Sequence, residues 1–405
     1  MVYDFSSIMD RRGKDAIALS PEAAMAKDVR GTKIKDGFSI IPMWVADMNF
    51  PTVPSIQEAI IARVNHPAFG YFSPSKEYFD SIIRWQETRN GVTGLTPACI
   101  GYENGVLGGV LSALGVFCSK GDKVLLHAPT YIGFTNALSN NGYDMVLSPL
   151  QKDKDGVWRM DFDDMEEKLR TEHIHAAVFC SPHNPCGRVW ERWEIERAME
   201  LFRKYDVYVV SDEIWSDLML NGHKHIPTQS VSEDARMRTA AMYAPSKTFN
   251  LAGLVGSYHI VYNPWMRDRM KKEASLSHYN SMNVLSMHAL IGAYKPEGQV
   301  WVDELCQVLS ENINFACDYI NKYFEGVSVS KPEGTYMLFL DCSAFCKKHG
   351  ISITQLEKAG IEVGVLWQDG RPFHGEYAIR MNLALPKSLV EEAFSRLSQY
   401  VFKPM

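Results

Sequence analysis

The amino-acid sequence predicts an α/β fold, in which a mostly parallel β-sheet is covered by helices on both faces and joined to a smaller α+β domain. Between about residues 94 and 261, short apolar runs bounded by Asp, Pro, Gly or Asn alternate with helical patterns. The runs are rich in Val, Leu, Ile, Tyr and Phe, as buried strands are. Beyond about residue 290 the alternation stops. The first pattern favours a parallel sheet buried on both faces, and the later one favours an α+β arrangement.

Six apolar runs are predicted to be strands of the large domain: residues 123–128, 145–149, 176–180, 207–211, 239–243 and 254–261. Residues 191–205 place apolar side chains at helical spacing among Glu, Arg and Lys, which predicts an amphipathic helix between two of these strands. A further helical stretch is expected around residues 275–294.

The C-terminal part is predicted to contain a long helix and three strands: residues 302–324, then 327–330, 337–340 and 376–383. Up to about residue 41 the chain is polar, charged and irregular. We therefore expect three parts along the chain. Residues 1–45 form an N-terminal segment that packs with the small domain, residues 46–290 form the large domain, and residues 291–405 form the small domain.

The composition narrows the class of protein. The 405 residues carry a formal net charge of −6, so nothing favours nucleic acid or a membrane surface as a partner. No apolar run approaches the roughly 20 residues that span a bilayer, and the first residues do not resemble a signal peptide. The scattered cysteines and the His-x-His pairs at 173/175 and 223/225 lack companion ligands, so no metal site is predicted. We expect a soluble, cytoplasmic protein.

Polar or aromatic side chains follow four of the predicted strands. Tyr131 follows the strand at 123–128 and Asn184 follows the strand at 176–180. Asp212 and Lys247 follow the strands at 207–211 and 239–243. In an open α/β sheet, ligands bind outside the carboxyl ends of the strands, so we expect these four side chains to line one site. Each alone more often has a structural role, such as forming a turn, and their ordered combination indicates the site.

The same side chains match the requirements of pyridoxal 5′-phosphate (PLP). A lysine amine such as Lys247 forms an imine with this cofactor and then carries protons. A buried carboxylate, Asp212, keeps the pyridine nitrogen protonated, while the Asn184 amide donates to the phenolic oxygen. Tyr131 can stack on the ring, and free N–H groups following Gly105 can hold the phosphate. The sequence therefore predicts a PLP-dependent enzyme that acts on an amino acid.

With these motifs the chain resembles the fold-type I PLP enzymes of the class I/II aminotransferase group. Within that group it looks most like the cystathionine β-lyase (C–S lyase) subgroup typified by MalY and PatB. The resemblance covers most of the chain, and its markers are residues 41–50 (IPMWVADMNF), 70–71 (GY), 181–190 (SPHNPCGRVW), 211–214 (SDEI), 244–250 (APSKTFN), 252–254 (AGL), 333–336 (EGTY) and 380–384 (RMNLA). It implies the fold-type I architecture.

The resemblance also implies roles for single residues. Lys247 matches the Schiff-base lysine, Asp212 the pyridinium partner, Asn184 the donor to the phenolic oxygen and Tyr131 the stacking ring. Arg380 matches the arginine that grips the substrate α-carboxylate, and Tyr71 matches a tyrosine that reaches the phosphate of the neighbouring subunit, which implies a homodimer with shared sites. The remaining expected contacts are Gly105, Val106, Leu107 and Ser246 at the phosphate, and Ala46 and Trp215, with Asn184, beside the substrate.

Two departures bear on the reaction. Many aminotransferases carry an arginine eight residues after the lysine, where this chain has Val255. This favours a C–S β-lyase that cleaves L-cysteine S-conjugates to thiol, pyruvate and ammonia. Trp215 stands where the subgroup usually has His, and residues 11–18 lack the usual Ser-x-Lys-Trp-Asp run, so the substrate stays open. An aminotransferase is the alternative, and a PLP-containing regulatory or binding protein is the third hypothesis.

Overall fold

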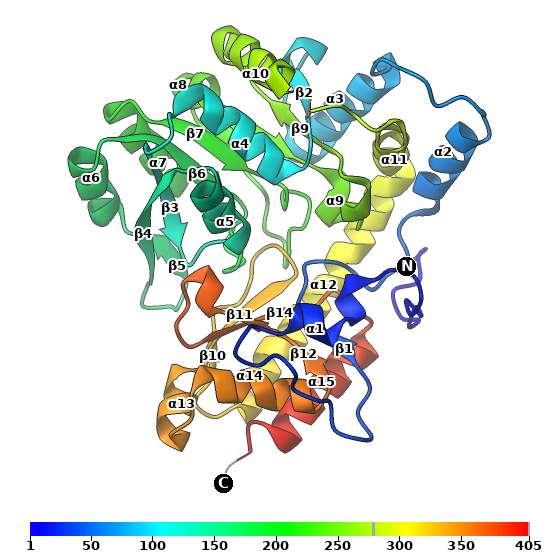
Figure 1. Cartoon of the computed structure of the whole chain (residues 1–405), viewed down its shortest axis with the longest axis vertical. Helices are drawn as coiled ribbons and strands as arrows, with labels where there is room; N and C mark the ends of the chain where they lie inside the picture. The colour runs from blue at the N-terminus through cyan, green and yellow to red at the C-terminus, as the bar shows by residue number, and fades with distance from the viewer. Residues whose placement is uncertain (278–279, 404–405) are drawn as a thin grey trace.

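A computed structural model describes residues 1–277 and 280–403 of the chain. Within these residues the large domain is built on an eight-stranded sheet (Figure 1). Its strands, in spatial order, are β2 (Ile100–Glu103), β9 (Ser257–Ile260), β8 (Thr239–Tyr243), β7 (Tyr208–Asp212), β6 (Ile174–Cys180), β3 (Lys123–Ala128), β4 (Asp144–Lys152) and β5 (Trp158–Met160). The five strands from β8 to β4 pair in parallel, and β2, β9 and β5 are joined in antiparallel fashion.

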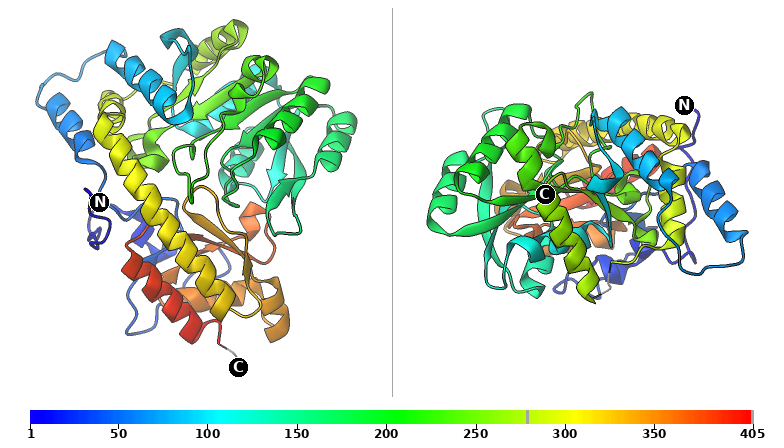
Figure 2. Two further views of the ribbon diagram at one scale, coloured as in Figure 1. Left: turned by 180° about the vertical axis from the view of Figure 1, so that it is seen from behind. Right: turned by 90° about the horizontal axis from the view of Figure 1, so that it is seen from above.

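Helices cover both faces of this sheet, because successive strand residues point to opposite sides. In β3, Val124 and Leu126 pack into a core with α4 (Val106–Phe117), α5 (Ile132–Asn140) and α10 (Pro264–Ser277). Leu125 packs on the other side with α6 (Phe162–Thr171) and α7 (Arg192–Lys204). Figures 1 and 2 show the two layers from opposite sides. The remaining helices of this domain are α2 (Pro54–Val64), α3 (Lys76–Asn90), α8 (Glu233–Arg238), α9 (Pro245–Thr248) and α11 (Val284–Ala293).

The small domain contains a four-stranded sheet in the order β10 (Ser328–Val329), β11 (Met337–Asp341), β14 (Ala378–Asn382) and β13 (Gln368–Asp369). The small domain also contains the helices α13 (Ser343–His349), α14 (Ile353–Glu362) and α15 (Lys387–Tyr400). The long helix α12 (Pro296–Tyr323) runs from the large domain along the small one (Figure 2). The N-terminal segment, with α1 (Pro21–Ala24), adds β1 (Ile41–Pro42), which pairs in parallel with β12 (Val365–Leu366).

The structure corrects several sequence-based boundaries. The expected strand at 254–261 is shorter, because Ala252–Leu254 form a 3-10 turn and Val255 has a φ of 47°, which no strand accommodates. The long helix begins at Pro296, where the proline occupies the first turn, instead of residue 302. The helical stretch at 275–294 comprises the end of α10 and α11, and its residues 278 and 279 lie outside the described residues. Strand β2 was not predicted.

No helix within residues 1–277 and 280–403 combines the length and the apolar character needed to cross a membrane.

Candidate active site

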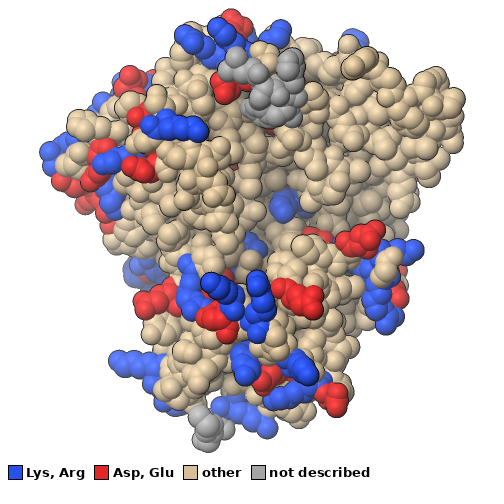
Figure 3. Space-filling model, in the orientation of Figure 1, with Lys and Arg blue, Asp and Glu red and all other residues tan. Residues whose placement is uncertain are grey.

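Four neighbouring strands end at one cavity of about 210 Å³, and Figure 3 shows the surface hollowed where the two domains meet. At this edge Asp212 is the last residue of β7, and the other three predicted residues, Tyr131, Asn184 and Lys247, follow β3, β6 and β8. Six further predicted residues line the same cavity: Ala46, Gly105, Val106, Leu107, Trp215 and Ser246. The structure therefore brings ten of the twelve predicted site residues together, although the predictions of their individual roles remain untested.

Lys247 lies on the single-turn helix α9, which starts with Pro245 and places the lysine at the strand end. Its Nζ donates a hydrogen bond of 2.8 Å to the carbonyl oxygen of Ala46 and lies 5.7 Å from the ring centroid of Trp215. Burial, together with the nearby positive charge of Arg380, lowers the pKa of Lys247 to about 8. An amine with this pKa is available in its neutral form near physiological pH.

Asp212 ends β7 and is buried, with 4% of its surface exposed. Its Oδ1 accepts a hydrogen bond of 3.0 Å from the backbone N–H of Ile214. Burial raises the pKa of Asp212 to about 7. The next carboxylate, Glu213, instead accepts hydrogen bonds from Tyr243 and pairs with His225 in the core. A cation placed against Asp212, such as a protonated pyridine nitrogen, would return its pKa to lower values.

The position of the Tyr131 ring depends on a glycine two residues later. Tyr131 precedes α5, and its ring meets Phe134 edge to face at 5.4 Å. A Cβ atom added at Gly133 would lie only 2.3 Å from Cε1 of Tyr131. The ring therefore occupies the space that any side chain at position 133 would need, and it presents an aromatic wall to the cavity.

The start of α4 forms a cradle suited to an anion. Gly105 precedes the helix with a φ of 78°, a conformation that L-residues rarely adopt, and no atom lies within 4 Å of the position of an added Cβ. The backbone N–H groups of Val106 and Leu107 belong to the first helical turn and have no partner within the helix. Ser246 and Val255 line the same cavity. A phosphate group fits this arrangement.

Arg380 belongs to β14 and is almost fully buried. Its Nη1 donates to Oδ1 of Asn184 at 3.2 Å, and its Nη2 donates to the carbonyl oxygen of Trp44 at 3.2 Å and to Oε1 of Gln368 at 2.5 Å. The buried Nε has no hydrogen-bond partner among the described residues. Burial lowers the pKa of Arg380 to about 10. A buried cation with an unsatisfied donor is a suitable partner for a carboxylate.

A segment that we call the strap, residues 44–48, connects the lysine with the arginine. Its carbonyl oxygens all accept side-chain hydrogen bonds: Trp44 from Arg380, Val45 and Asp47 from Asn382, Ala46 from Lys247, and Met48 from Asn250 and Arg11. Asn250 and Asn382 were not predicted as site residues, although both stand in the motifs at 244–250 and 380–384. Their position in these motifs was the available signal.

Two predicted residues differ from the rest in their surroundings. Trp215 is buried, and its ring meets that of Tyr336 edge to face at 4.8 Å. Tyr71 does not line the cavity, and its side chain is fully exposed on the segment between α2 and α3. Within this chain Tyr71 therefore makes no contribution to the cavity wall.

The residues present fit PLP, on three observations of the structure. A lysine of lowered pKa, a buried carboxylate and an aromatic ring line one cavity. The open cradle at Gly105 suits the phosphate. The unsatisfied Nε of Arg380 suits the carboxylate of an amino-acid substrate.

Comparisons with known proteins agree with this geometry. Residues 40–397 match the family model for aminotransferase class I and II. The chain is 34% identical over 360 residues to cystathionine β-lyase PatB of Bacillus subtilis, covering 88% of this chain and 91% of that one, and 30% identical over 405 residues to protein MalY of Escherichia coli, covering 98% of each. The structure of the PLP-bound C–S lyase from Staphylococcus hominis has a TM-score of 0.88 at 30% identity and covers 100% of both chains. A PLP-bound putative aminotransferase from Clostridium difficile has a TM-score of 0.89 at 32% identity, covering 98% of this chain and 99% of that one. The expected resemblance and fold are confirmed.

Proposed function

Because the chain belongs to the class I and II aminotransferase family, we propose that it is a PLP-dependent C–S β-lyase. Its substrates are L-cysteine S-conjugates of the cystathionine type, and its products are a thiol, pyruvate and ammonia. The names of PatB and of the Staphylococcus hominis C–S lyase support this reaction. The observation on the site that carries the proposal is that Lys247, whose lowered pKa makes it a base, shares one cavity with the buried Asp212 and lies near the buried Arg380.

The side chains of the site divide the chemistry among them. PLP, when bound, supplies an electron sink that stabilises negative charge at the substrate α-carbon. Nζ of Lys247, neutral in part near pH 8, accepts the proton from that carbon. Arg380 holds the α-carboxylate through its planar guanidinium and so orients the α-carbon. With PLP bound, the Asp212 carboxylate would accept a hydrogen bond from the protonated pyridine nitrogen, and the Tyr131 ring would stack on the cofactor.

Val255 supports a lyase over an aminotransferase. It lines the cavity at the position where many aminotransferases carry a phosphate-binding arginine, and its backbone is left-handed with a φ of 47°. The phosphate of bound PLP would therefore be held by the N–H groups at the start of α4, by Ser246 and by groups from a second subunit, with no arginine at position 255.

The surface around Tyr71 supports a homodimer. The exposed apolar side chains of α2 and the segment after it include Ile61, Val64, Phe69 and Phe72. In Figure 3 few charged side chains lie over this part of the face, at the upper right. Large exposed apolar patches mark protein interfaces, so a second copy of the chain is expected to cover this one. Tyr71 then reaches the phosphate in the site of the partner subunit.

The experiment is an assay for pyruvate with purified holoenzyme and cystathionine, in the absence of any oxo acid. Steady release of pyruvate, lost in Lys247→Ala together with the visible absorbance of the bound cofactor, is the expected result. If turnover instead requires 2-oxoglutarate, the enzyme is an aminotransferase. If Lys247→Ala leaves the visible absorbance unchanged, the assignment of the PLP lysine is wrong.

A further inference from the structure

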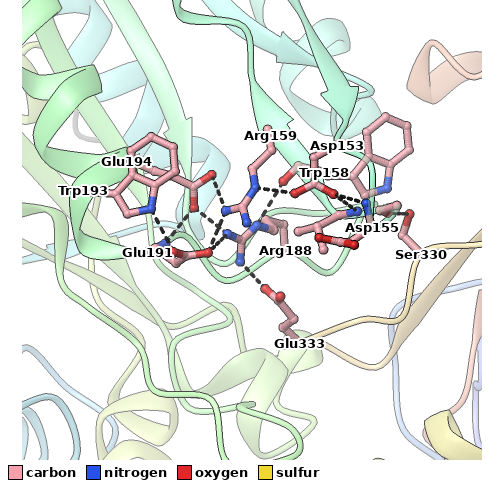
Figure 4. Close-up of polar contacts among 12 residues, drawn as sticks. Asp153, Asp155, Trp158, Arg159, Arg188, Glu191, Trp193, Glu194, Ser330 and Glu333 are labelled. Atoms are coloured by element: carbon pink, nitrogen blue, oxygen red, sulfur yellow. Dashed lines mark hydrogen bonds and ion pairs between the residues drawn. The ribbon is translucent and has the colours of Figure 1, made fainter.

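A polar network outside the cavity joins the loop that carries Asn184 to the segment that carries Tyr336. Arg188 lies at the centre of this network, with 3% of its side chain exposed. It forms an ion pair with Glu333, which belongs to the small domain (Figure 4). Both residues stand in motifs of the sequence, at 181–190 and 333–336, but the proposed reaction assigns no role to Arg188 or to Glu333.

Each of the three guanidinium nitrogens of Arg188 donates hydrogen bonds. Its Nη1 donates to Glu333 and to the carbonyl oxygen of Val189, and its Nη2 donates to Glu194 at 2.5 Å. The Nη2 also contacts Glu191 at 3.0 Å, and Nε donates to the carbonyl oxygen of Trp158 at 3.0 Å. Within this network Glu333 is the partner that belongs to the small domain, and its carboxylate accepts a second hydrogen bond from the N–H of Val189.

The backbones on the two sides of this ion pair are in direct contact. The N–H groups of Glu333 and Gly334 both donate to the carbonyl oxygen of Gly187, at 2.8 and 3.0 Å. Gly187 has a φ of 68°, and an added Cβ would lie 2.6 Å from Cβ of Pro332. The contact therefore requires glycine at this position, and it leaves no room for a shift of one segment along the other.

One segment leads to a residue that lines the cavity, and the other leads to a residue that packs on the cavity wall. Asn184 lies three residues before Gly187 and accepts the hydrogen bond of Arg380. Tyr336 lies three residues after Glu333, and its ring packs on Trp215. It is followed by β11, in which Phe339 pairs with Arg380 of β14. The place of the Pro332–Tyr336 segment therefore sets where Arg380 stands relative to Asn184.

We propose that Arg188 and Glu333 are positioning residues that hold the carboxylate-binding strand of the small domain against the Asn184 loop. This inference rests on the proposed function only in taking Arg380 as the group that binds the substrate carboxylate. Arg188 and Glu333 act through Arg380 and Asn184, and they touch neither cofactor nor substrate.

Arg159 offers a matched control in the same network. It pairs with Asp153, Glu191 and Glu194, but it contacts neither Glu333 nor the loop from Asn184 to Gly187 (Figure 4). Glu333→Gln keeps the shape of the side chain and removes its charge, whereas Arg159→Gln removes a guanidinium from the same cluster. A general effect of disturbing this ion-pair cluster would appear in both variants.

The experiment compares Glu333→Gln and Arg159→Gln holoenzymes with the wild type in steady-state kinetics on cystathionine. Glu333→Gln is expected to raise KM about tenfold, with kcat within about threefold and with unchanged visible absorbance of the cofactor. Arg159→Gln is expected to leave KM within about twofold. An unchanged KM in Glu333→Gln, or an equal rise in both variants, overturns the proposal. Should Glu333→Gln fail to fold, Arg188→Lys, which keeps the charge and loses the forked contacts, is expected to give the same rise in KM.

Hydrogen–deuterium exchange supplies a readout that does not depend on turnover. In Glu333→Gln the backbone amides of 333–335, which donate to Gly187 and Leu218, are expected to exchange about tenfold faster than in the wild type. Arg159→Gln is expected to leave them unchanged, and equal exchange in all three proteins contradicts the proposal. A wild-type enzyme that releases no pyruvate would contradict the proposed function, whereas the exchange result would still decide on this contact.

Discussion

Nη1 of Arg380 lies 3.2 Å from Oδ1 of Asn184, so a hydrogen bond between two side chains joins the two domains inside the site. The arginine comes from a small-domain strand and the asparagine from a large-domain loop. Substrate recognition is therefore linked to the relative position of the domains, since a change in that position changes this distance.

Arg380→Lys is expected to raise KM for the amino-acid substrate about 30- to 150-fold, because lysine cannot form the forked contact, worth about 2–3 kcal/mol. The visible absorbance of the bound cofactor is expected to persist, since Lys247 and Asp212 are unchanged. Steady-state kinetics and absorbance spectra test both statements. Arg371→Lys, at an arginine paired with Asp369 near the surface, is the control and is expected to leave KM unchanged. A KM near the wild-type value in Arg380→Lys would exclude the carboxylate role.

The rate at which apoprotein binds PLP covalently is expected to depend on the pKa of Lys247, about 8. Below that pH the neutral amine falls tenfold per unit, so the rate is expected to rise steeply from pH 6 to 8 and to level off above about 9. Stopped-flow absorbance measures it. Arg380→Gln removes a positive charge that lowers this pKa, so its inflection is expected at higher pH. A wild-type rate still rising at pH 10 would contradict the lowered pKa.

Gly133→Ala is expected to weaken PLP binding about tenfold, because the new Cβ displaces the Tyr131 ring from the cavity wall. In a helix the same change ordinarily adds up to about 1 kcal/mol of stability, so the melting temperature of the apoprotein is not expected to fall. Titration of apoprotein with PLP and a thermal melt separate the two effects. Tyr131→Phe, which keeps the ring, is expected to retain most of the affinity. Equal PLP affinity in Gly133→Ala and wild type would show that the ring position is unimportant.

Glu357 on α14 is expected to make stability depend on pH. Its side chain is 99% buried, and burial together with the nearby Asp369 raises its pKa from 4.5 to about 7. The pKa of Glu357 is higher in the folded chain than in the unfolded chain. The contribution of neutral Glu357 to the free energy of unfolding is therefore complete below about pH 4.5 and is lost as pH rises through 7.

Glu357→Gln stays neutral at every pH and is therefore expected to exceed the wild type in stability at pH 8, by about 1–3 kcal/mol, and to match it near pH 5. Melting temperatures at the two pH values measure this. The exposed Glu376→Gln is the control and is expected to behave as the wild type at both. A gain for Glu357→Gln at pH 5 as large as at pH 8 would contradict the titration of Glu357.

The parallel sheet and the cavity wall were predictable because their signals are local. Each of Tyr131, Asn184, Asp212 and Lys247 follows its own apolar run, and the rule that ligands bind at strand ends places them together. Period-two burial in β3 likewise follows from a short sequence. The domain limits at 45 and 290, and the partner role of Tyr71, stay predictions.

Contacts between residues far apart in the sequence could not be predicted from local sequence patterns. Asn250 donates a hydrogen bond to the carbonyl oxygen of Met48, which lies 202 positions away in the sequence, and Asn382 donates to that of Val45, which lies 337 positions away. Asparagine is also common in turns, so its side chain alone indicates no partner. The left-handed Val255 was missed for a related reason, since a β-branched residue ordinarily predicts a strand. Tertiary packing selects such conformations against local preference.

The strap from Trp44 to Met48 has a consequence for how sequences of this kind can vary. Each of its five carbonyl oxygens accepts a hydrogen bond from the side chain of Lys247, Asn250, Arg380, Asn382 or Arg11. Inserting or deleting one residue here would shift every carbonyl by about 3.5 Å and break the whole set. These oxygens belong to the backbone, so a substitution in this segment leaves them in place, whereas a change of its length does not. We therefore expect that length changes which preserve activity fall before Arg11 or after Asn49.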